Sequence, residues 1–291
     1  MIYLTLNDGK KIPQLGFGVW SIPCNEEGKN IIKEAIRIGY RHFDTAHVYA
    51  NEKIVGEAIA ESGLPREEFF VTSKIWPTEF GYKKTKKAVE EMLKRCRLDY
   101  LDMVLLHKET MDYMGAYKAL EEYVDKGLIK SIGVSNFETK KKIDNLWKNA
   151  KYKPTMNQLE SHPYRQREDL NELTKEYGTY LESWSPLGHG VSGLLKDPVV
   201  AEIAKAHDKT TAQVVLRWHI QKGYIVIPMT SNVEHMKQNL EIFDFELSEE
   251  EMTSTNAVDG KFKLDNMSKW MEPIAHWFQG LGLKGIDKNQ R

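Results

Sequence analysis

The sequence has almost no net charge and no long apolar run. Among its 291 residues, 41 Lys and Arg stand against 42 Asp and Glu, a formal net charge of −1. Proteins that neutralise many phosphates carry a basic excess, so we expect no nucleic-acid partner. No apolar stretch approaches the roughly 18 residues of a membrane span, and the first residues lack the pattern of a secretory signal. We therefore expect a cytoplasmic protein with no membrane contact.

Cysteine is also scarce. Only Cys24 and Cys96 are present, and neither belongs to a CxxC or Cys/His ligand spacing. We expect no disulfide framework and no metal site. Cys24 lies close to Trp20 in the sequence, and a buried structural thiol is the simpler interpretation of it than a residue at the rim of a pocket.

Short apolar or β-branched runs alternate with longer segments of helical period along most of the chain. Eight runs are typical of buried strands: residues 15–19, 42–46, 69–75, 103–107, 129–135, 155–160, 179–185 and 224–229. Between them lie helical segments such as 30–38, 83–97, 116–126, 139–148, 167–177 and 212–221. Repeated strand–helix units predict parallel strands joined by right-handed crossovers, in an open doubly wound sheet or a closed barrel.

Eight units favour the barrel, since a (β/α)8 TIM barrel typically takes about 250 residues. Residues 3–6 and 11–15 flank an Asp8-Gly9 turn, which predicts an N-terminal β-hairpin that could close the bottom of the barrel. We expect one domain over residues 1–291. Its irregular C-terminal tail, residues 261–291, is expected to fold over the active site with Trp270, Met271, Trp277 and Phe278.

Four ionisable or donor residues stand at or just after three consecutive predicted strands. They are Asp44, Tyr49, Lys74 and His107. A single polar residue at a strand end is usually a solvated or capping group, but four that converge at one end of a barrel indicate chemistry. A buried Lys74 needs a partner, and Asp44 is the nearest candidate. An ammonium beside a phenol is expected to lower the pKa of Tyr49 and make it a proton donor suited to carbonyl reduction.

The residues around these positions resemble the aldo-keto reductase family. The similar stretches, in chain order from residue 15 to about 239, are HFDTAHVY (42–49), NE (51–52), VGEA (55–58), VTSKIW (71–76), LLH (105–107), GVSNF (133–137), NQLESHP (157–163) and SWSPLG (183–188). The resemblance implies hydride transfer from C4 of a reduced nicotinamide, NADPH or NADH, to an aldehyde or ketone. Tyr49 would then protonate the carbonyl oxygen, Lys74 and Asp44 would adjust the pKa of Tyr49, and His107 would orient the carbonyl.

The same resemblance implies the cofactor contacts. Ser135, Asn136 and Gln158 would hold the nicotinamide carboxamide, and the ring would stack on Trp184. The full set of implied cofactor-binding residues is Gly18, Val19, Ser135, Asn136, Gln158, Trp184, Ser185, Leu187, Thr230, His235, Gln238 and Asn239.

Two departures from the family pattern bear on specificity. Met229 and His235 replace the two cations that usually bind the 2′-phosphate of NADPH, so we expect NADH to be used at least as well as NADPH. Lys108 replaces a tryptophan of the substrate pocket, whose apolar wall Trp20 and Trp76 would keep. Lys108 either favours a bulkier or anionic carbonyl substrate or simply points to solvent.

Rival interpretations stay open from the sequence. The chain could be a non-catalytic dinucleotide-binding barrel, a sensor or subunit, since fold alone does not prove activity. A metal-dependent hydrolase barrel is the weaker rival, because no H-x-H or H-E-x-x-H pairing is present. Residues 188–193 fit G-x-G-x-x-G, but they follow the seventh strand, not the first. The resemblance to aldo-keto reductases instead implies a loop that closes over the cofactor pyrophosphate. The expected assembly is a monomer or a weak dimer.

Overall fold

The computed structural model describes residues 2–190 and 193–260, so the predicted tail over the active site lies outside the described residues. The strands are β1 (Tyr3–Thr5), β2 (Lys11–Pro13), β3 (Phe17–Gly18), β4 (His42–Asp44), β5 (Phe70–Ile75), β6 (Leu101–Leu106), β7 (Ile129–Ser135), β8 (Met156–Glu160), β9 (Tyr180–Trp184) and β10 (Ile225–Val226). The α-helices are α1 (Glu26–Ile38), α2 (Glu52–Glu61), α3 (Tyr82–Cys96), α4 (Tyr113–Asp125), α5 (Lys140–Asn149), α6 (Glu168–Lys175), α7 (Pro198–Ala206), α8 (Thr211–Gln221), α9 (Val233–Leu240) and α10 (Glu249–Asn256).

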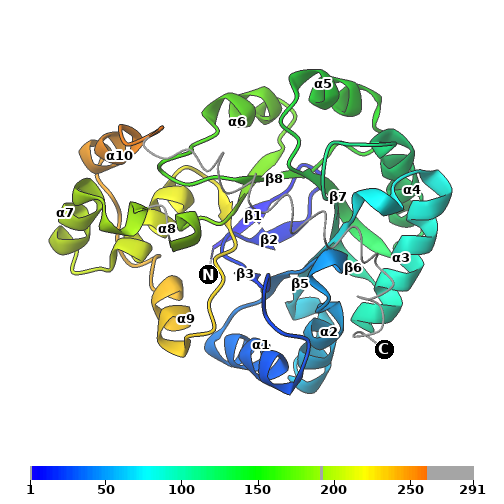
Figure 1. Cartoon of the computed structure of the whole chain (residues 1–291), viewed down its shortest axis with the longest axis horizontal. Coiled ribbons are helices and arrows are strands. Elements are labelled where there is room, and N and C mark those ends of the chain that lie inside the picture. Colours follow the sequence, from blue (N-terminus) through cyan, green and yellow to red (C-terminus); the bar gives the residue numbers. More distant parts are fainter. Residues whose placement is uncertain (1, 191–192, 261–291) are drawn as a thin grey trace.

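Strands β3 to β10 form one parallel sheet in which each strand pairs with its neighbour in the chain. The sheet closes on itself where Leu15 pairs with Val226 in parallel, and the Gly16 amide donates to the Val226 carbonyl at 2.8 Å. The helices surround the strands on the outside (Figure 1). The predicted (β/α)8 barrel with an N-terminal hairpin is confirmed.

The hairpin β1–β2 is antiparallel and turns at Gly9, whose φ of 83° suits glycine. Its Ile12 is fully buried and lies among apolar side chains from the hairpin itself and from the interior of the barrel. These partners are Leu6, Phe70, Met103, Leu105, Met156 and Ile225. This apolar plug fills the lower part of the barrel, so the polar interior residues lie above it, toward the carboxyl ends of the strands.

Capping residues mark the starts of several helices. Asn25 caps α1 by accepting from the Gly28 amide, and Thr210 forms a capping box with Gln213 at the start of α8. Gly56 brings α2 against the end of α3, because a Cβ there would lie 1.6 Å from the carbonyl oxygen of Cys96. None of the helices in the described ranges is long and apolar enough to cross a bilayer.

The first and last barrel strands are shorter than the sequence predicts. The expected strands 15–19 and 224–229 shrink to β3 and β10, with two residues each. Pro228 has no amide hydrogen and cannot extend the ladder, although its carbonyl still accepts from the Gly18 amide at 3.1 Å.

Candidate active site

The four predicted catalytic residues converge at the carboxyl ends of β4, β5 and β6. Lys74 is fully buried, and its Nζ donates to Asp44 Oδ1 at 2.5 Å and to the Thr45 carbonyl at 3.0 Å. The same Nζ lies 3.5 Å from the Tyr49 hydroxyl. The ring of His107 lies edge-on to that of Tyr49, with centroids 6.0 Å apart. One ammonium therefore links a buried carboxylate to a phenol beside an imidazole.

The turn that carries Tyr49 is held on both sides. Tyr49 ends a 3-10 turn, η1 (His47–Tyr49), and His47 Nδ1 lies 2.9 Å from Glu79 Oε1. After the turn, Asn51 Nδ2 donates to the carbonyls of Val19 and Ile22 at 2.7 and 3.0 Å. These bonds hold the turn at the carboxyl end of the barrel and so fix the position of the Tyr49 side chain.

Burial and neighbouring charges shift the pKa values of Tyr49, Lys74 and His107. Burial raises the pKa of Tyr49, and the negative charge of Asp44 adds to this, so together they outweigh the lowering by Lys74. The predicted net lowering is therefore wrong, and Tyr49 stays protonated at neutral pH. Burial opposes the charge of Lys74, but Asp44 outweighs it and raises the pKa of the ammonium. Burial, helped by Lys74, holds the pKa of His107 well below its usual value, so its imidazole is neutral.

A second group of predicted residues gathers at the ends of β7, β8 and β9. Asn136, with φ of 56°, donates from Nδ2 to the His107 carbonyl and to Ser135 Oγ at 3.1 and 2.9 Å. Its Oδ1 accepts from Trp184 Nε1 at 3.0 Å, which fixes the half-buried indole. Gln158 Nε2 donates to Asp44 Oδ2 at 2.8 Å and to Glu182 Oε2 at 2.6 Å.

These bonds decide which groups stay available to a ligand. Ser135 Oγ already accepts a hydrogen bond, which leaves its hydroxyl proton to donate. Gln158 uses both amide protons, so it offers only its Oε1 as an acceptor. One donor and one acceptor beside an aromatic face complement a primary carboxamide on a flat ring, so these residues fit a nicotinamide.

A third group lies on the segment from β10 to α9. Met229 is 39% exposed, Thr230 Oγ1 accepts from the Asn232 amide at 3.1 Å, and His235 is exposed on the first turn of α9. Gln238 is half-buried, and Asn239 is buried on the same helix. These residues follow β10, whereas the buried catalytic residues follow β4, β5 and β6, so the two groups come from different strands of the barrel.

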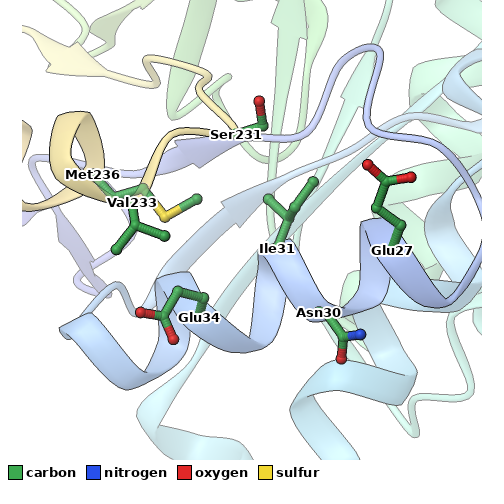
Figure 2. A pocket seen from close by; sticks show the side chains of 7 residues that line it. All are labelled: Glu27, Asn30, Ile31, Glu34, Ser231, Val233 and Met236. Atoms are coloured by element: carbon green, nitrogen blue, oxygen red, sulfur yellow. The ribbon is translucent and has the colours of Figure 1, made fainter.

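A pocket of about 560 Å³ adjoins this segment, between α1 and α9 (Figure 2). In Figure 2 the side chains of Glu27 and Ile31 point from α1 toward the side on which Ser231 lies, and Glu34 lies near Val233. Two carboxylates therefore line the pocket that the segment after β10 borders.

The predicted substrate residues contact His107, Trp76 and His189. Trp76 is buried, with its ring centroid 5.0 Å from that of His107. Lys108 is exposed, and its Nζ lies 5.6 Å from the Trp76 ring centroid. Trp20 is 45% exposed, and the ring of His189 lies edge-on to it at 6.2 Å.

A pocket of about 450 Å³ includes Tyr49 in its lining. It is lined by Ser21, Ile22, Pro23, Cys24, Asn25, Tyr49 and Ala50. Cys24 is half-buried there, so the interpretation of it as a buried structural thiol is wrong.

Comparison with known proteins agrees with this geometry. The family model described as "Aldo/keto reductase family" matches residues 14–259. The chain belongs to the aldo-keto reductase family. It is 43% identical over 251 residues to the 9,11-endoperoxide prostaglandin H2 reductase of Trypanosoma cruzi, covering 86% of this chain and 88% of that protein. It is 42% identical over 255 residues to the glyoxal reductase of Bacillus subtilis, covering 87% and 91%.

The solved structures agree. The aldo-keto reductase from a Medee basin deep-sea metagenome library superposes with a TM-score of 0.86 at 40% identity, over 89% of this chain and 96% of that one. This aldo-keto reductase is therefore an NAD(P)H-dependent oxidoreductase that reduces an aldehyde or ketone to an alcohol. The reported relatives give no support to a non-catalytic binding barrel.

Two other predictions concern the loops of this reductase. Of the G-x-G-x-x-G stretch, Gly188 and Gly193 have positive φ, and His189 lies edge-on to Trp184 at 5.8 Å. Residues 191 and 192 lie outside the described residues, so closure over a pyrophosphate stays a prediction. Within the described part of the chain, no group of three or more His, Cys, Asp or Glu is placed to hold a metal ion.

Sequence reasoning missed one buried acid of this reductase. Glu182 lies in the middle of β9, is fully buried and bonds to Gln158. A charged residue in the middle of a predicted buried strand was the available signal. Ser73 and Arg95, which both donate to the buried Glu52 at 2.5 Å, form a second such network behind the Tyr49 turn.

Proposed function

We propose that Tyr49 is the proton donor of carbonyl reduction in this reductase. The observation that carries the proposal is its hydroxyl 3.5 Å from Lys74 Nζ, beside the neutral imidazole of His107. Tyr49 is protonated at neutral pH, as a donor must be, and Lys74 stabilises the phenolate left behind. A neutral His107 donates a hydrogen bond that orients the carbonyl and supports the oxygen as negative charge develops.

The cofactor assignment rests on the groups left available around Trp184. Ser135 and Gln158 Oε1 would hold the carboxamide of a reduced nicotinamide by donating to its oxygen and accepting from its nitrogen, and the indole of Trp184 would pack on the ring. The group would supply the hydride, from C4. The remaining cofactor contacts predicted from the sequence, from Gly18 and Val19 to Asn239, belong to the same proposal.

Replacing Tyr49 by phenylalanine tests the proton donor. The Y49F variant should lose about 10²- to 10⁴-fold in kcat, the range of a general acid, while the Kd for NADH stays within about twofold of wild type. Stopped-flow absorbance gives kcat, and tryptophan fluorescence gives Kd. The control is Y152F, since Tyr152 lies between α5 and β8 and its hydroxyl donates to Asp125 at the end of α4. A Y49F variant that keeps more than one-tenth of kcat contradicts the assignment.

We propose further that NADH serves at least as well as NADPH. Met229 and the exposed His235 offer no fixed cation to a 2′-phosphate, which prefers Arg or Lys. The carboxylate of Glu27 lines the adjoining pocket and adds a negative charge that disfavours a doubly charged phosphate, whereas Glu34 in the same lining is paired with Arg37. A kcat/KM that favours NADPH a hundredfold or more would overturn this preference.

For the substrate, we propose a carbonyl compound with an apolar body and an anionic group. Trp20 and Trp76 give an apolar wall, and Lys108 places a positive charge above Trp76. The reported relatives are named for different substrates, glyoxal and prostaglandin H2, so the choice depends on this chain's own residues. A panel of paired neutral and acidic aldehydes and ketones tests it.

The assembly and extent of the protein stay predictions from the sequence. We propose one domain over residues 1–291, acting in the cytoplasm as a monomer or weak dimer. Light scattering during size-exclusion chromatography measures the mass in solution, and a stable higher oligomer would contradict the proposed state.

A further inference from the structure

Glu182 is a fully buried acid, bonded to Gln158 beside the catalytic residues, that the proposed mechanism leaves unused. Its Oε2 accepts from Gln158 Nε2 at 2.6 Å. Its Oε1 has no hydrogen-bond partner within the described residues, and His42 Nε2 lies 3.6 Å from it. Such an atom is costly to bury as an unpaired charge.

Gln158 connects this acid to the catalytic group. Its amide nitrogen donates to Glu182 on one side and to Asp44 Oδ2 on the other, at 2.8 Å. Asp44 in turn accepts from Lys74, whose Nζ faces the Tyr49 hydroxyl. A continuous row of polar contacts therefore runs from the phenol to the middle of the barrel.

The charges around Glu182 can be counted strand by strand. β4 contributes Asp44 and His42, β5 contributes Lys74, and β8 contributes the uncharged Gln158. Burial lowers the pKa of His42 to about 3, so its ring is neutral. Lys74 is then the single cation that these strands supply, and it is bound to Asp44.

Two carboxylates that share one amide and one cation cannot both stay ionised without cost. Asp44 has the direct contact with Lys74, so Glu182 is the group that keeps a proton. Burial and the charge of Asp44 agree, because they raise the pKa of Glu182 to about 8.

We propose that Glu182 is a positioning residue of the reductase. As a neutral carboxylic acid it accepts a hydrogen bond from the Gln158 amide nitrogen and so turns the amide oxygen of Gln158 toward the nicotinamide carboxamide. Because Glu182 carries no charge, the positive charge of Lys74 is neutralised by Asp44 alone. This inference rests on the roles proposed for Gln158 and Tyr49. Glu182 touches neither substrate nor cofactor and acts through Gln158.

Loss of the Glu182 proton has a defined consequence. Its carboxylate would add a negative charge near Lys74 and Tyr49, which raises the pKa of the phenol. In alcohol oxidation the phenolate is the base, so rates in the parent protein rise only at higher pH. A side chain that cannot ionise at position 182 should move the apparent pKa of Tyr49 downward by roughly 0.5 to 1 unit.

Two variants separate orientation from charge. E182Q keeps an acceptor for Gln158 but cannot ionise, and it should bind NADH within about twofold of wild type while showing the downward shift in the pH profile of alcohol oxidation. E182M has no acceptor, which frees the Gln158 amide to turn, so the Kd for NADH should rise about tenfold, the effect of one hydrogen bond. Fluorescence titration measures Kd.

Infrared spectroscopy of the protein without cofactor gives a readout independent of activity. The carbonyl stretch of a protonated carboxylic acid should be present at neutral pH, vanish as pH rises through about 8, and be absent in E182Q. The matched control E90Q removes an exposed glutamate of α3 and should leave the band unchanged.

The outcomes decide between Glu182 and the wider mechanism. If E182Q retains the infrared band and the parent pH profile, the inference is overturned, even if E182M does not fold. If E182M folds and binds NADH as tightly as the parent, the orienting role is overturned. Failure of the proposed function would instead appear in Y49F, as retained turnover with every Glu182 variant unaffected.

Discussion

Replacing Lys74 by methionine should destabilise the barrel strongly and in a pH-dependent way. Lys74 and Asp44 are 0% and 2% exposed, and the ammonium supplies the bond to Asp44 Oδ1. Methionine fills most of the lysine volume, so little of the loss comes from a cavity. Asp44 keeps only the Gln158 bond on Oδ2, and breaking a buried pair in this way costs about 3–5 kcal/mol.

The sign of the pH dependence follows from Asp44. Burial already raises its pKa, and Lys74 is the main opposing charge, so removing the lysine raises the folded-state pKa further above the unfolded value. A group with a raised folded pKa favours the folded state at low pH and loses that contribution as pH rises. The deficit of K74M relative to wild type should therefore be full near pH 8 and shrink toward pH 5.

Urea unfolding followed by circular dichroism measures this deficit at both pH values. The double variant D44N/K74M removes the unpaired charge and should recover more than half of the loss. A K74M deficit below about 1 kcal/mol near pH 8, or a double variant no more stable than K74M, would refute the claim that an uncompensated Asp44 causes the loss.

Three further changes have defined outcomes. M229K/H235R should raise kcat/KM for NADPH more than tenfold with little effect on NADH, by steady-state kinetics; no change means that the phosphate is bound elsewhere. K108Q should raise KM for an acidic carbonyl substrate about tenfold and leave its neutral analogue within twofold, and equal effects on both would argue against a charge role. G56A forces a Cβ to within 1.6 Å of the Cys96 carbonyl oxygen and should lower Tm by several degrees in calorimetry; an unchanged Tm would contradict a close contact between α2 and α3.

The sequence was sufficient for what depends on local pattern. Alternating apolar runs and helical segments predicted the barrel, because each strand and helix carries its own periodicity. Asp44, Lys74 and His107 could be placed together, because the carboxyl ends of parallel strands meet at one end of a barrel. Strand limits were less accurate, as at Pro228, since pairing depends on both partners.

Effects that depend on the summed surroundings of one atom were not predictable. The pKa of Tyr49 follows from burial and from charges on β4, β5 and β9 together, so the nearby Lys74 alone gave the wrong sign. Gln158 was expected only to contact the cofactor, but its two acidic acceptors lie 114 and 24 positions away in the sequence. Glu182 was overlooked because its partners become neighbours only after the barrel closes.

The seam of the barrel has a consequence for synthesis of the chain. Leu15 pairs with Val226, more than 200 positions later, so the sheet keeps two open edges until β10 has left the ribosome. Nascent chains with open edges can pair with one another and aggregate. Here β3 and β10, the two strands that meet where the barrel closes, have only two residues each, so they offer few backbone hydrogen-bonding groups to a strand of another chain. A copy truncated before Val226 would keep its edges open permanently, and such fragments should need chaperones or rapid degradation.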